Sequence, residues 1–439
     1  MATIPTPSLI AQATIILEAA TSLQRQLEQD GLKQPSFEAD GRKDWQDAVE
    51  HPEILKARSA LIDASNMMLN LALGPLDTLS SLVGPAVSKV DVLRTLDALG
   101  VPEAVPLKGS ISISDLATKV GAHPKLLQQQ LKFAYLMGIF WEPQEGFVAH
   151  TSISAAMPAL SPWTQTRLNY LFNSGAWKVP EALRVWQDSP PPEHVQVPVS
   201  LADPQHRDFW RALQEDDPDG RGMEKFSSAM RALLIGHSGN SASLFLKGFD
   251  WTSMNNGLVV DVGGGNGHIE VNILNGIPSG IQFLIQDLAA NESPAVETIQ
   301  LHGVKERVQF QVHDFFSAQP PELRPKAYLL SRILHDWQDE DCLKILRNLI
   351  PAMAEHGTKL FVMERVVPDH IGDVPNHVEQ LIRTQDLLMF TLFGGGERSL
   401  REWKTLFSRA DARLRIAAIR YSLLSPFSCM EVVLEKNDN

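Results

Sequence analysis

A histidine follows an apolar stretch in the segment AYLLSRILHDWQDED, which covers residues 327–341. The apolar and β-prone residues before it predict a buried strand, so His335 would lie at the carboxyl end of that strand. Two interpretations of this residue are open. It is either an incidental histidine in a helix-capping turn or a general base at the mouth of an active site. The other motifs of the chain decide between them.

A glycine-rich loop follows a second strand-like run in LVVDVGGGNGHIEVNIL. Gly263 and Gly265 allow a tight turn and a close approach of the backbone to a ligand. Asp261 precedes the glycines, and the next predicted strand ends in Asp287, about 20 residues further on, where a carboxylate grips ribose hydroxyls in dinucleotide-binding folds. The spacing differs from the dinucleotide pattern G-x-G-x-x-G, and no lysine or serine follows as in a phosphate-binding loop. An acid just before the glycines suits a cationic or amino-acid-bearing ligand.

A third strand-like run ends in VHDFF, which places Asp314 and Phe315 at another strand end. Taken alone, the pair could be a helix cap beside a core aromatic. In order after Asp261, the glycines and Asp287, it supplies a carboxylate that can bind hydroxyls and a ring that can stack on adenine. The set predicts S-adenosylmethionine rather than NAD as the cofactor.

Strand-like runs and amphipathic helical stretches alternate from about residue 257 onward, in LVVDV, IQFLIQD, VQFQVHD, AYLLSRIL, KLFVMERVV, LRIAAIRYSLL and CMEVVLEK. This alternation predicts a mainly parallel sheet with helices on both faces, in a domain at 251–439. Ligands of such sheets bind beyond the carboxyl ends of the strands. The motifs described above would therefore meet at one edge of the sheet.

Three regions precede this domain. Helical spacing predicts a helical N-terminal region at 1–85 and a helical connecting region at 156–250. Between them, residues 86–155 combine a helix–turn–helix pattern with a short hairpin, which predicts a winged-helix-like subdomain. Its second helix, KLLQQQLKFAYLMGIF, is more apolar than basic, so we expect a buried scaffold or dimerisation surface rather than DNA binding.

The composition excludes some classes of function. At 439 residues the chain should hold about two or three domains. A net charge of −13 and a pI of about 5.5 argue against nucleic-acid binding, because a phosphate backbone would be repelled. Two cysteines suit a reducing compartment, and neither a basic leader nor an apolar run of about 20 residues is present. We expect a cytoplasmic protein that binds no membrane.

The motifs together resemble the caffeic-acid type of small-molecule O-methyltransferases, and particularly their fungal secondary-metabolite relatives. The resemblance covers nearly the whole chain, in FVAHTSIS, MEKFSSAM, FDW, VDVGGGNG, HDW and GGGERS. It implies an α/β Rossmann-like methyltransferase domain, an N-terminal all-α dimerisation region, a winged-helix-like subdomain and a homodimer. It also implies methyl transfer from S-adenosylmethionine to a phenolic or enolic hydroxyl of a small molecule such as a polyketide.

The resemblance implies that His335 of HDW is the general base, supported by Glu364 of VMERVVP and Glu397 of GGGERS. A phenolic hydroxyl has a pKa of about 10, and a neutral imidazole with a pKa of about 6.5 can take its proton during attack on the methyl group. A carboxylate would fix the imidazole tautomer and stabilise the imidazolium. We expect all three side chains in one crevice, Ser399 and Glu402 in a capping box, and no metal ion.

Apolar residues before GGGERS are candidates for an acceptor pocket, although helical spacing also fits plain core: Leu388, Met389 and Phe393. Ser331 departs from the family pattern, because relatives place a lysine or arginine four residues before the histidine. Strand alternation predicts that the neighbouring Arg332 points to the opposite face. Two alternatives are kept: a pericyclase or dehydratase that uses the cofactor without methyl transfer, and a non-enzymatic regulator built on the winged helix.

Overall fold

A computed structural model describes residues 8–48, 50–187, 196–233, 246, 248–254, 256–421 and 426–435. The last residues of the predicted runs LRIAAIRYSLL and CMEVVLEK, 422–424 and 436, lie outside these ranges. The chain forms two compact units. The first holds Met1–Leu168 with Pro375–His377, and the second holds Asn169–Val374 with Val378–Asn439. The domain limits expected after residues 85, 155 and 250 stay predictions.

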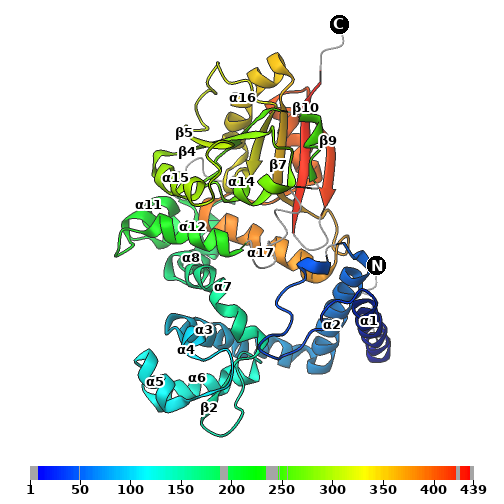
Figure 1. The fold of residues 1–439 in the computed structure, drawn as a ribbon, viewed down its shortest axis with the longest axis vertical. Helices are drawn as coiled ribbons and strands as arrows, with labels where there is room; N and C mark the ends of the chain where they lie inside the picture. Colours follow the sequence, from blue (N-terminus) through cyan, green and yellow to red (C-terminus); the bar gives the residue numbers. More distant parts are fainter. Residues whose placement is uncertain are drawn as a thin grey trace. The chain divides into compact units, whose positions relative to one another are not determined.

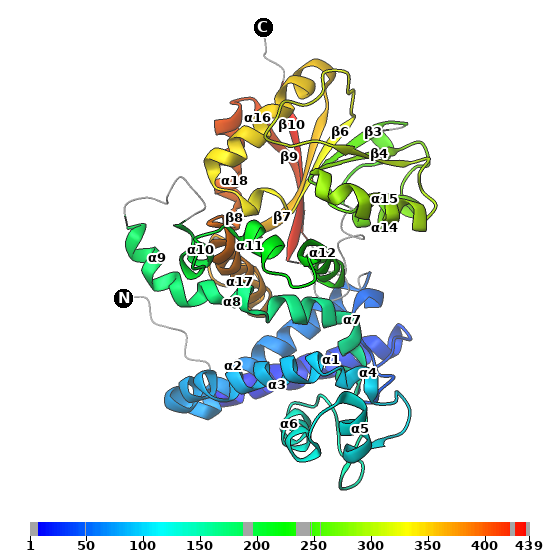
Figure 2. The same ribbon diagram turned by 90° about the vertical axis from the view of Figure 1, so that its left-hand side faces the viewer.

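The first unit is helical, with one short hairpin (Figure 2). Its longest helix, α2, bends at Gly74, whose φ of 72° precedes Pro75 inside the helix. Strands β1 and β2 pair antiparallel through Ile111–Val148 and Ser112–Phe147, with α5 and α6 between them in the chain. An antiparallel bridge between Trp141 and Ala149 closes the expected hairpin, and these elements together give the winged-helix-like arrangement. The elements are α1 Leu9–Gln29, η1 Gln46–Ala48, α2 Pro52–Val83, α3 Pro85–Ala98, α4 Val101–Ala104, β1 Ile111–Ser112, α5 Ile113–Val120, α6 Pro124–Leu136, β2 Phe147–Val148 and α7 Ser152–Arg167.

The second unit is built on a mixed sheet with the strand order β5-β4-β3-β6-β7-β10-β9 (Figure 1). Strands β5 to β7 are parallel, β10 runs antiparallel to β7 and β9, and the short β8 pairs with β7. The order reverses between β3 and β6, and ligands bind at such a switch point. The strands are β3 Leu258–Val262, β4 Gln282–Asp287, β5 Val308–Val312, β6 Ala327–Ser331, β7 Lys359–Val367, β8 Arg398–Ser399, β9 Leu414–Tyr421 and β10 Phe427–Leu434.

Helices cover both faces of this sheet, because buried residues alternate along the strands. Val259 and Leu329 join one core with residues of α14 and α15, whereas Val260 and Leu330 join a second core with residues of α16 and α18. The expected Rossmann-like domain is therefore confirmed. The principal helices of the unit are α8 Tyr170–Ser174, α9 Val179–Val185, α10 Pro198–Ala202, α11 Phe209–Glu215, α12 Gly222–Leu233, α14 His268–Ile273, α15 Glu292–Leu301, α16 Asp339–His356, α17 Asn376–Phe393 and α18 Leu400–Ala410.

A search of the described residues for a membrane-crossing helix finds none of sufficient length and apolarity.

Candidate active site

The turn that carries His335 begins where β6 ends. Arg332 leaves the strand with a φ of +57°, and residues 334–336 form a short 3-10 helix, η7. The Oε1 atom of Glu364, which lies within β7, accepts hydrogen bonds from the backbone N–H groups of Ile333 and Leu334, both at 2.9 Å. A buried carboxylate therefore holds the shape of this turn, since it binds two backbone donors that the strand no longer pairs.

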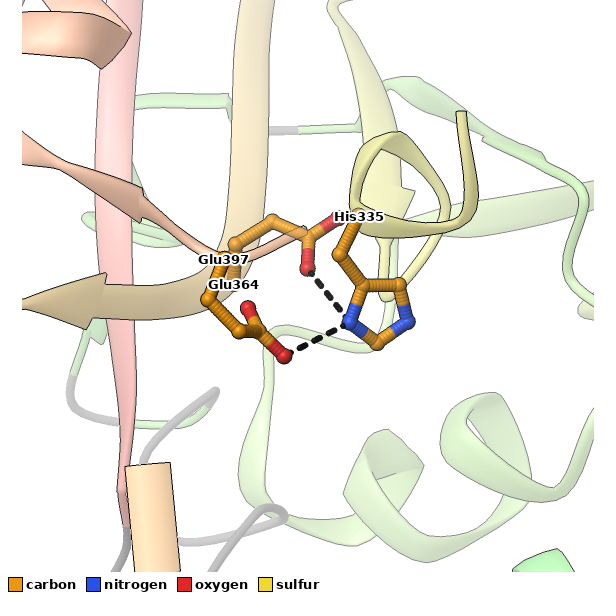
Figure 3. A group of neighbouring side chains, drawn as sticks. All are labelled: His335, Glu364 and Glu397. Carbon is orange, nitrogen blue, oxygen red and sulfur yellow. Dashed lines mark hydrogen bonds and ion pairs between the residues drawn. The ribbon is translucent and has the colours of Figure 1, made fainter. Parts of the chain in front are cut away.

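Two glutamates face the same nitrogen of the histidine (Figure 3). His335 Nδ1 lies 3.0 Å from Glu397 Oε1 and 3.6 Å from Glu364 Oε2. All three residues are buried, and their side chains meet as expected. A ligand crevice beside them stays a prediction. With a carboxylate acceptor at Nδ1, that nitrogen carries the proton of the neutral ring, and Nε2 is the nitrogen left for other partners. The Oδ1 atom of Asp336 lies 3.4 Å from Nε2.

The GGGERS loop packs directly against the turn that carries His335. Gly396 N–H donates to the His335 carbonyl at 3.0 Å, and a Cβ atom added at Gly395 would collide with the same carbonyl. Beyond the loop, Ser399 and Glu402 form the predicted capping box at the start of α18. The glycines thus let the loop approach closely enough for Glu397 to reach the imidazole.

Two further residues hold Glu397 in place. Its backbone N–H donates to Asp386 at 2.9 Å, and its Oε1 atom accepts from Arg365 Nη1 at 2.9 Å. Sequence reasoning missed both. Arg365 directly follows Glu364 in β7, so alternation would place the two side chains on opposite faces. The arginine side chain is long enough to reach Glu397 all the same. The signal in the sequence that could have indicated this contact was a charged residue next to a predicted catalytic acid.

The charges of the cluster change its proton affinities. Burial lowers the pKa of His335, but Glu364, Glu397 and Asp336 raise it more, to about 9. Burial raises the pKa of Glu364 to about 7 and that of Asp336 to about 6. Burial also raises the pKa of Glu397, but His335 and Arg365 outweigh it and leave the pKa lowered. The clustered acids therefore favour the imidazolium form of His335 at neutral pH, unlike the neutral imidazole assumed from the sequence.

His335, Glu364 and Glu397 also place three donor atoms within 4.8 Å of one another, a spacing that could hold a metal ion. The geometry has a simpler electrostatic explanation. Glu397 already pairs with the imidazole and with Arg365, and Glu364 binds the backbone of the turn. Arg365, the imidazole and the backbone N–H groups thus already compensate the negative charge that a metal ion would otherwise neutralise.

The glycine loop lies at the end of β3. Gly263 has a φ of +80° and Gly265 a φ of +59°, so both need the freedom of glycine. A Cβ atom added at Gly263 would lie 2.5 Å from Ile333 Cδ1, which shows how closely the histidine turn approaches this loop. Gly265 N–H donates to Asp287 Oδ2 at 2.8 Å. Asp287 therefore shapes the loop in addition to any contact with a ligand.

Asp261 lies beneath the loop with its side chain fully buried. Its carboxyl group lies beside the buried carboxyl of Glu270 in α14, with which it shares a side-chain hydrogen bond, and no other donor among the described residues bonds to either group. Burial raises the pKa of Asp261 well above its ordinary range, and the neighbouring Glu270 raises it further. A buried carboxylate without a cationic or backbone donor is costly unless a ligand completes it, which fits the expected ligand with a cationic group.

Asp314 and Phe315 lie beyond the end of β5. Asp314 is exposed and accepts a hydrogen bond from the backbone of Phe316 at 2.9 Å. Phe315 is half-buried, 5.8 Å from the Trp337 ring between centroids and 3.5 Å from the position of a Cβ atom on Gly263. The ring thus lies beside both the glycine loop and the HDW segment, and it is less exposed to solvent than the carboxylate of Asp314.

Leu388, Met389 and Phe393 are buried in α17. Phe393 packs edge-on against Phe209, with ring centroids 5.1 Å apart, and stacks on Trp210 at 5.4 Å. These contacts describe core packing between α17 and α11, so a role of the three residues in binding an acceptor stays a prediction.

Arg332 does not follow the strand alternation expected for it. Because its backbone turns into the left-handed region, its side chain reaches the glycine loop, where Nη2 lies 3.3 Å from His268 Nε2. The prediction that it points to the opposite face is wrong, since the strand ends one residue earlier. Neither Arg332 nor His268 was among the predicted site residues.

Parallel strands with a glycine loop after the first, an acid at the end of the second and a histidine after the fourth, in a mixed sheet covered by helices, define the Rossmann-like methyltransferase class. A family model described as an O-methyltransferase domain matches residues 218–412. O-methyltransferase aurJ of Gibberella zeae is 32% identical over 96% of both chains. O-methyltransferase pgmB of Aspergillus terreus is 32% identical over 96% of this chain and 95% of its own. This chain belongs to that family of fungal secondary-metabolite O-methyltransferases.

Solved structures agree in fold. The crystal structure of OxaC in complex with sinefungin and meleagrin has a TM-score of 0.74 and 21% identity, covering 97% of this chain and 99% of its own. The mitomycin 7-O-methyltransferase MmcR has a TM-score of 0.67 and 23% identity, covering 82% and 97%. The protein is an S-adenosylmethionine-dependent O-methyltransferase. This excludes the non-enzymatic regulator, and the names of the relatives do not favour the pericyclase or dehydratase alternative.

Proposed function

We propose that the protein methylates a phenolic or enolic hydroxyl of a small secondary metabolite such as a polyketide, with His335 as the general base. The observation that carries this proposal is the buried contact of His335 Nδ1 with Glu397, at a strand end next to the glycine loop. Such a contact fixes the tautomer in which Nε2 can take a proton. The names of the relatives support transfer to oxygen.

The residues of the glycine loop fit S-adenosylmethionine. When bound, this cofactor supplies a methyl group on a positively charged sulfur. Asp261 would face a cationic part of it, the backbone of Gly263 and Gly265 would allow close approach, and Asp287 would bind ribose hydroxyls. Asp314 and Phe315 would hold the adenosine, the one by hydrogen bonding and the other by stacking.

His335 can accept a proton only after it has lost its own. The surrounding acids raise its pKa to about 9, which favours the imidazolium at neutral pH. A second positive charge bound nearby would disfavour the imidazolium and lower this pKa. The neutral imidazole would then take the hydroxyl proton at Nε2, while Glu397 stabilises the positive charge that forms on the ring.

Transfer of label tests this function directly. We expect the purified protein, given S-adenosylmethionine with an isotopically labelled methyl group and a panel of phenolic polyketides, to form one equivalent of S-adenosylhomocysteine per labelled methyl ether. Mass spectrometry of both products measures the ratio. Conversion of an acceptor without S-adenosylhomocysteine would contradict the proposal and favour a pericyclase or dehydratase.

We also propose that the protein is a homodimer formed through its N-terminal helices. Large apolar side chains are exposed on α1, α2 and α3: Leu9, Ile10, Leu17, Leu76, Leu79, Leu82, Val83 and Val87. Apolar surface of this kind is typical of an interface between subunits. Light scattering should give twice the mass of the chain, and Leu79→Glu with Leu82→Glu should yield a monomer. A monomeric wild-type protein would contradict this.

A further inference from the structure

A chain of side chains links the glycine loop to the histidine turn. His268 Nδ1 lies 2.8 Å from Asn266 Oδ1, and its Nε2 atom lies 3.3 Å from Arg332 Nη2. Burial lowers the pKa of His268 to about 3, and Arg332 contributes to the shift. The neutral ring therefore donates from Nδ1 to the asparagine and accepts at Nε2 from the guanidinium. His268 thus orients Arg332 beside the loop.

The two outer residues of this row, Asn266 and Arg332, each have a buried polar atom that lacks a hydrogen-bond partner among the described residues. Arg332 Nε and Asn266 Nδ2 are buried, and neither has a hydrogen-bond partner in the described ranges. Both atoms are donors, and both belong to residues that adjoin the glycine loop. A buried donor that lacks a partner is destabilising, so two of them near one loop point to an acceptor that arrives with a ligand.

An acidic residue, Asp261, lies in the same region as these two donors. Asp261 has two buried oxygens that receive no hydrogen bond from a cationic or backbone donor among the described residues; its hydrogen-bond partner is the buried acid Glu270, and it acts electrostatically on Arg332. A carboxylate and a guanidinium that are both incompletely paired complement a zwitterion, in which an ammonium and a carboxylate are held on one carbon atom. Free amino acids and the amino-acid part of S-adenosylmethionine have this chemistry.

We propose that Arg332, oriented by His268 and assisted by Asn266, binds the α-carboxylate of the amino-acid part of the cofactor. The inference rests on S-adenosylmethionine as the ligand of this loop. It gives the site the positive charge that the sequence lacks at Ser331, where relatives place a lysine or arginine. The left-handed turn at Arg332 makes this possible, because it redirects the residue from the sheet face to the loop.

The test compares two ligands that differ in the amino-acid part. S-adenosylhomocysteine carries the α-carboxylate, and 5′-methylthioadenosine lacks the whole amino-acid part. By calorimetry, Arg332→Met should weaken S-adenosylhomocysteine binding about 10- to 100-fold, the range expected for hydrogen bonds to a charged group. Binding of 5′-methylthioadenosine should stay within about twofold of wild type. Arg332→Lys should recover part of the lost affinity, because it retains the charge.

Arg324→Met is the matched control, since Arg324 is exposed and bonds only to nearby carbonyls of its own loop among the hydrogen bonds of the described residues. It should change neither affinity. Unchanged S-adenosylhomocysteine binding by Arg332→Met would overturn the inference. Equal losses for both ligands, in Arg332→Met and in Arg332→Lys, would also overturn it, because Arg332 would then support the loop generally. If the wild-type protein binds neither ligand, the cofactor assignment itself fails.

Discussion

The His335 cluster and the glycine loop lie close together at strand ends, but they differ in how far the protein itself supplies hydrogen-bond partners for their buried acids. In the cluster, Glu364 and Glu397 each have one oxygen engaged by backbone, imidazole or Arg365. Under the loop, the structure places no cationic or backbone donor of any described residue on either oxygen of Asp261, whose hydrogen-bond partner is another buried acid, Glu270. The protein thus positions His335 with its own residues, whereas the buried polar groups of the glycine loop are left for a bound ligand to pair.

Gly263→Val should produce the largest effect on the loop and little on the cluster. The added side chain would collide with Ile333 and would need a φ of +80°, which a β-branched residue does not tolerate. We expect S-adenosylhomocysteine affinity to fall more than about 100-fold by calorimetry. Gly303→Val is the control, because Gly303 also has a positive φ but open space around it. Equal losses in both variants would show that the collision is unimportant.

Glu397→Gln should affect the cluster and spare the loop. Because Glu397 is one of the groups that raise the pKa of His335, the variant should lower it. In the wild type, kcat/KM should rise with pH with a midpoint near 9 and level off above it, since only the neutral imidazole accepts a proton and kcat/KM reports the free enzyme. The midpoint should move to lower pH in the variant, with a maximal rate at least about tenfold lower. Exposed Glu322→Gln should change neither quantity. An unshifted midpoint would contradict the assigned electrostatics.

Ser399→Ala should have the smallest effect and shows how firmly the cluster is held. The substitution removes the N-cap of α18 and should cost about 1 kcal/mol in the free energy of unfolding, measured with urea. The rate of methyl transfer should change less than about twofold, because Arg365 and Asp386 still position Glu397. A large loss of rate at intact stability would mean that the cap, rather than these two residues, positions the glutamate.

The sequence predicted the strands, the glycine loop and the meeting of His335 with both glutamates, because strand ends of a parallel sheet share one edge. It did not predict Arg332 or Arg365. Neither guanidinium lies on the face that strand alternation predicts. The backbone of Arg332 turns into the left-handed region, and the side chain of Arg365 is long enough to reach Glu397. The raised pKa of His335 was also beyond it, since that value depends on the tertiary clustering of three acids and on burial.

Substitution of the histidine tests the proposed mechanism most directly. In the presence of saturating S-adenosylmethionine and a phenolic acceptor, His335→Ala should form S-adenosylhomocysteine about 10²–10⁴-fold more slowly than wild type, with cofactor affinity unchanged. His302→Ala, which alters an exposed histidine at the end of α15, serves as the control and should retain the full rate. A His335→Ala variant that methylates at the wild-type rate would contradict the role of this imidazole as the proton acceptor.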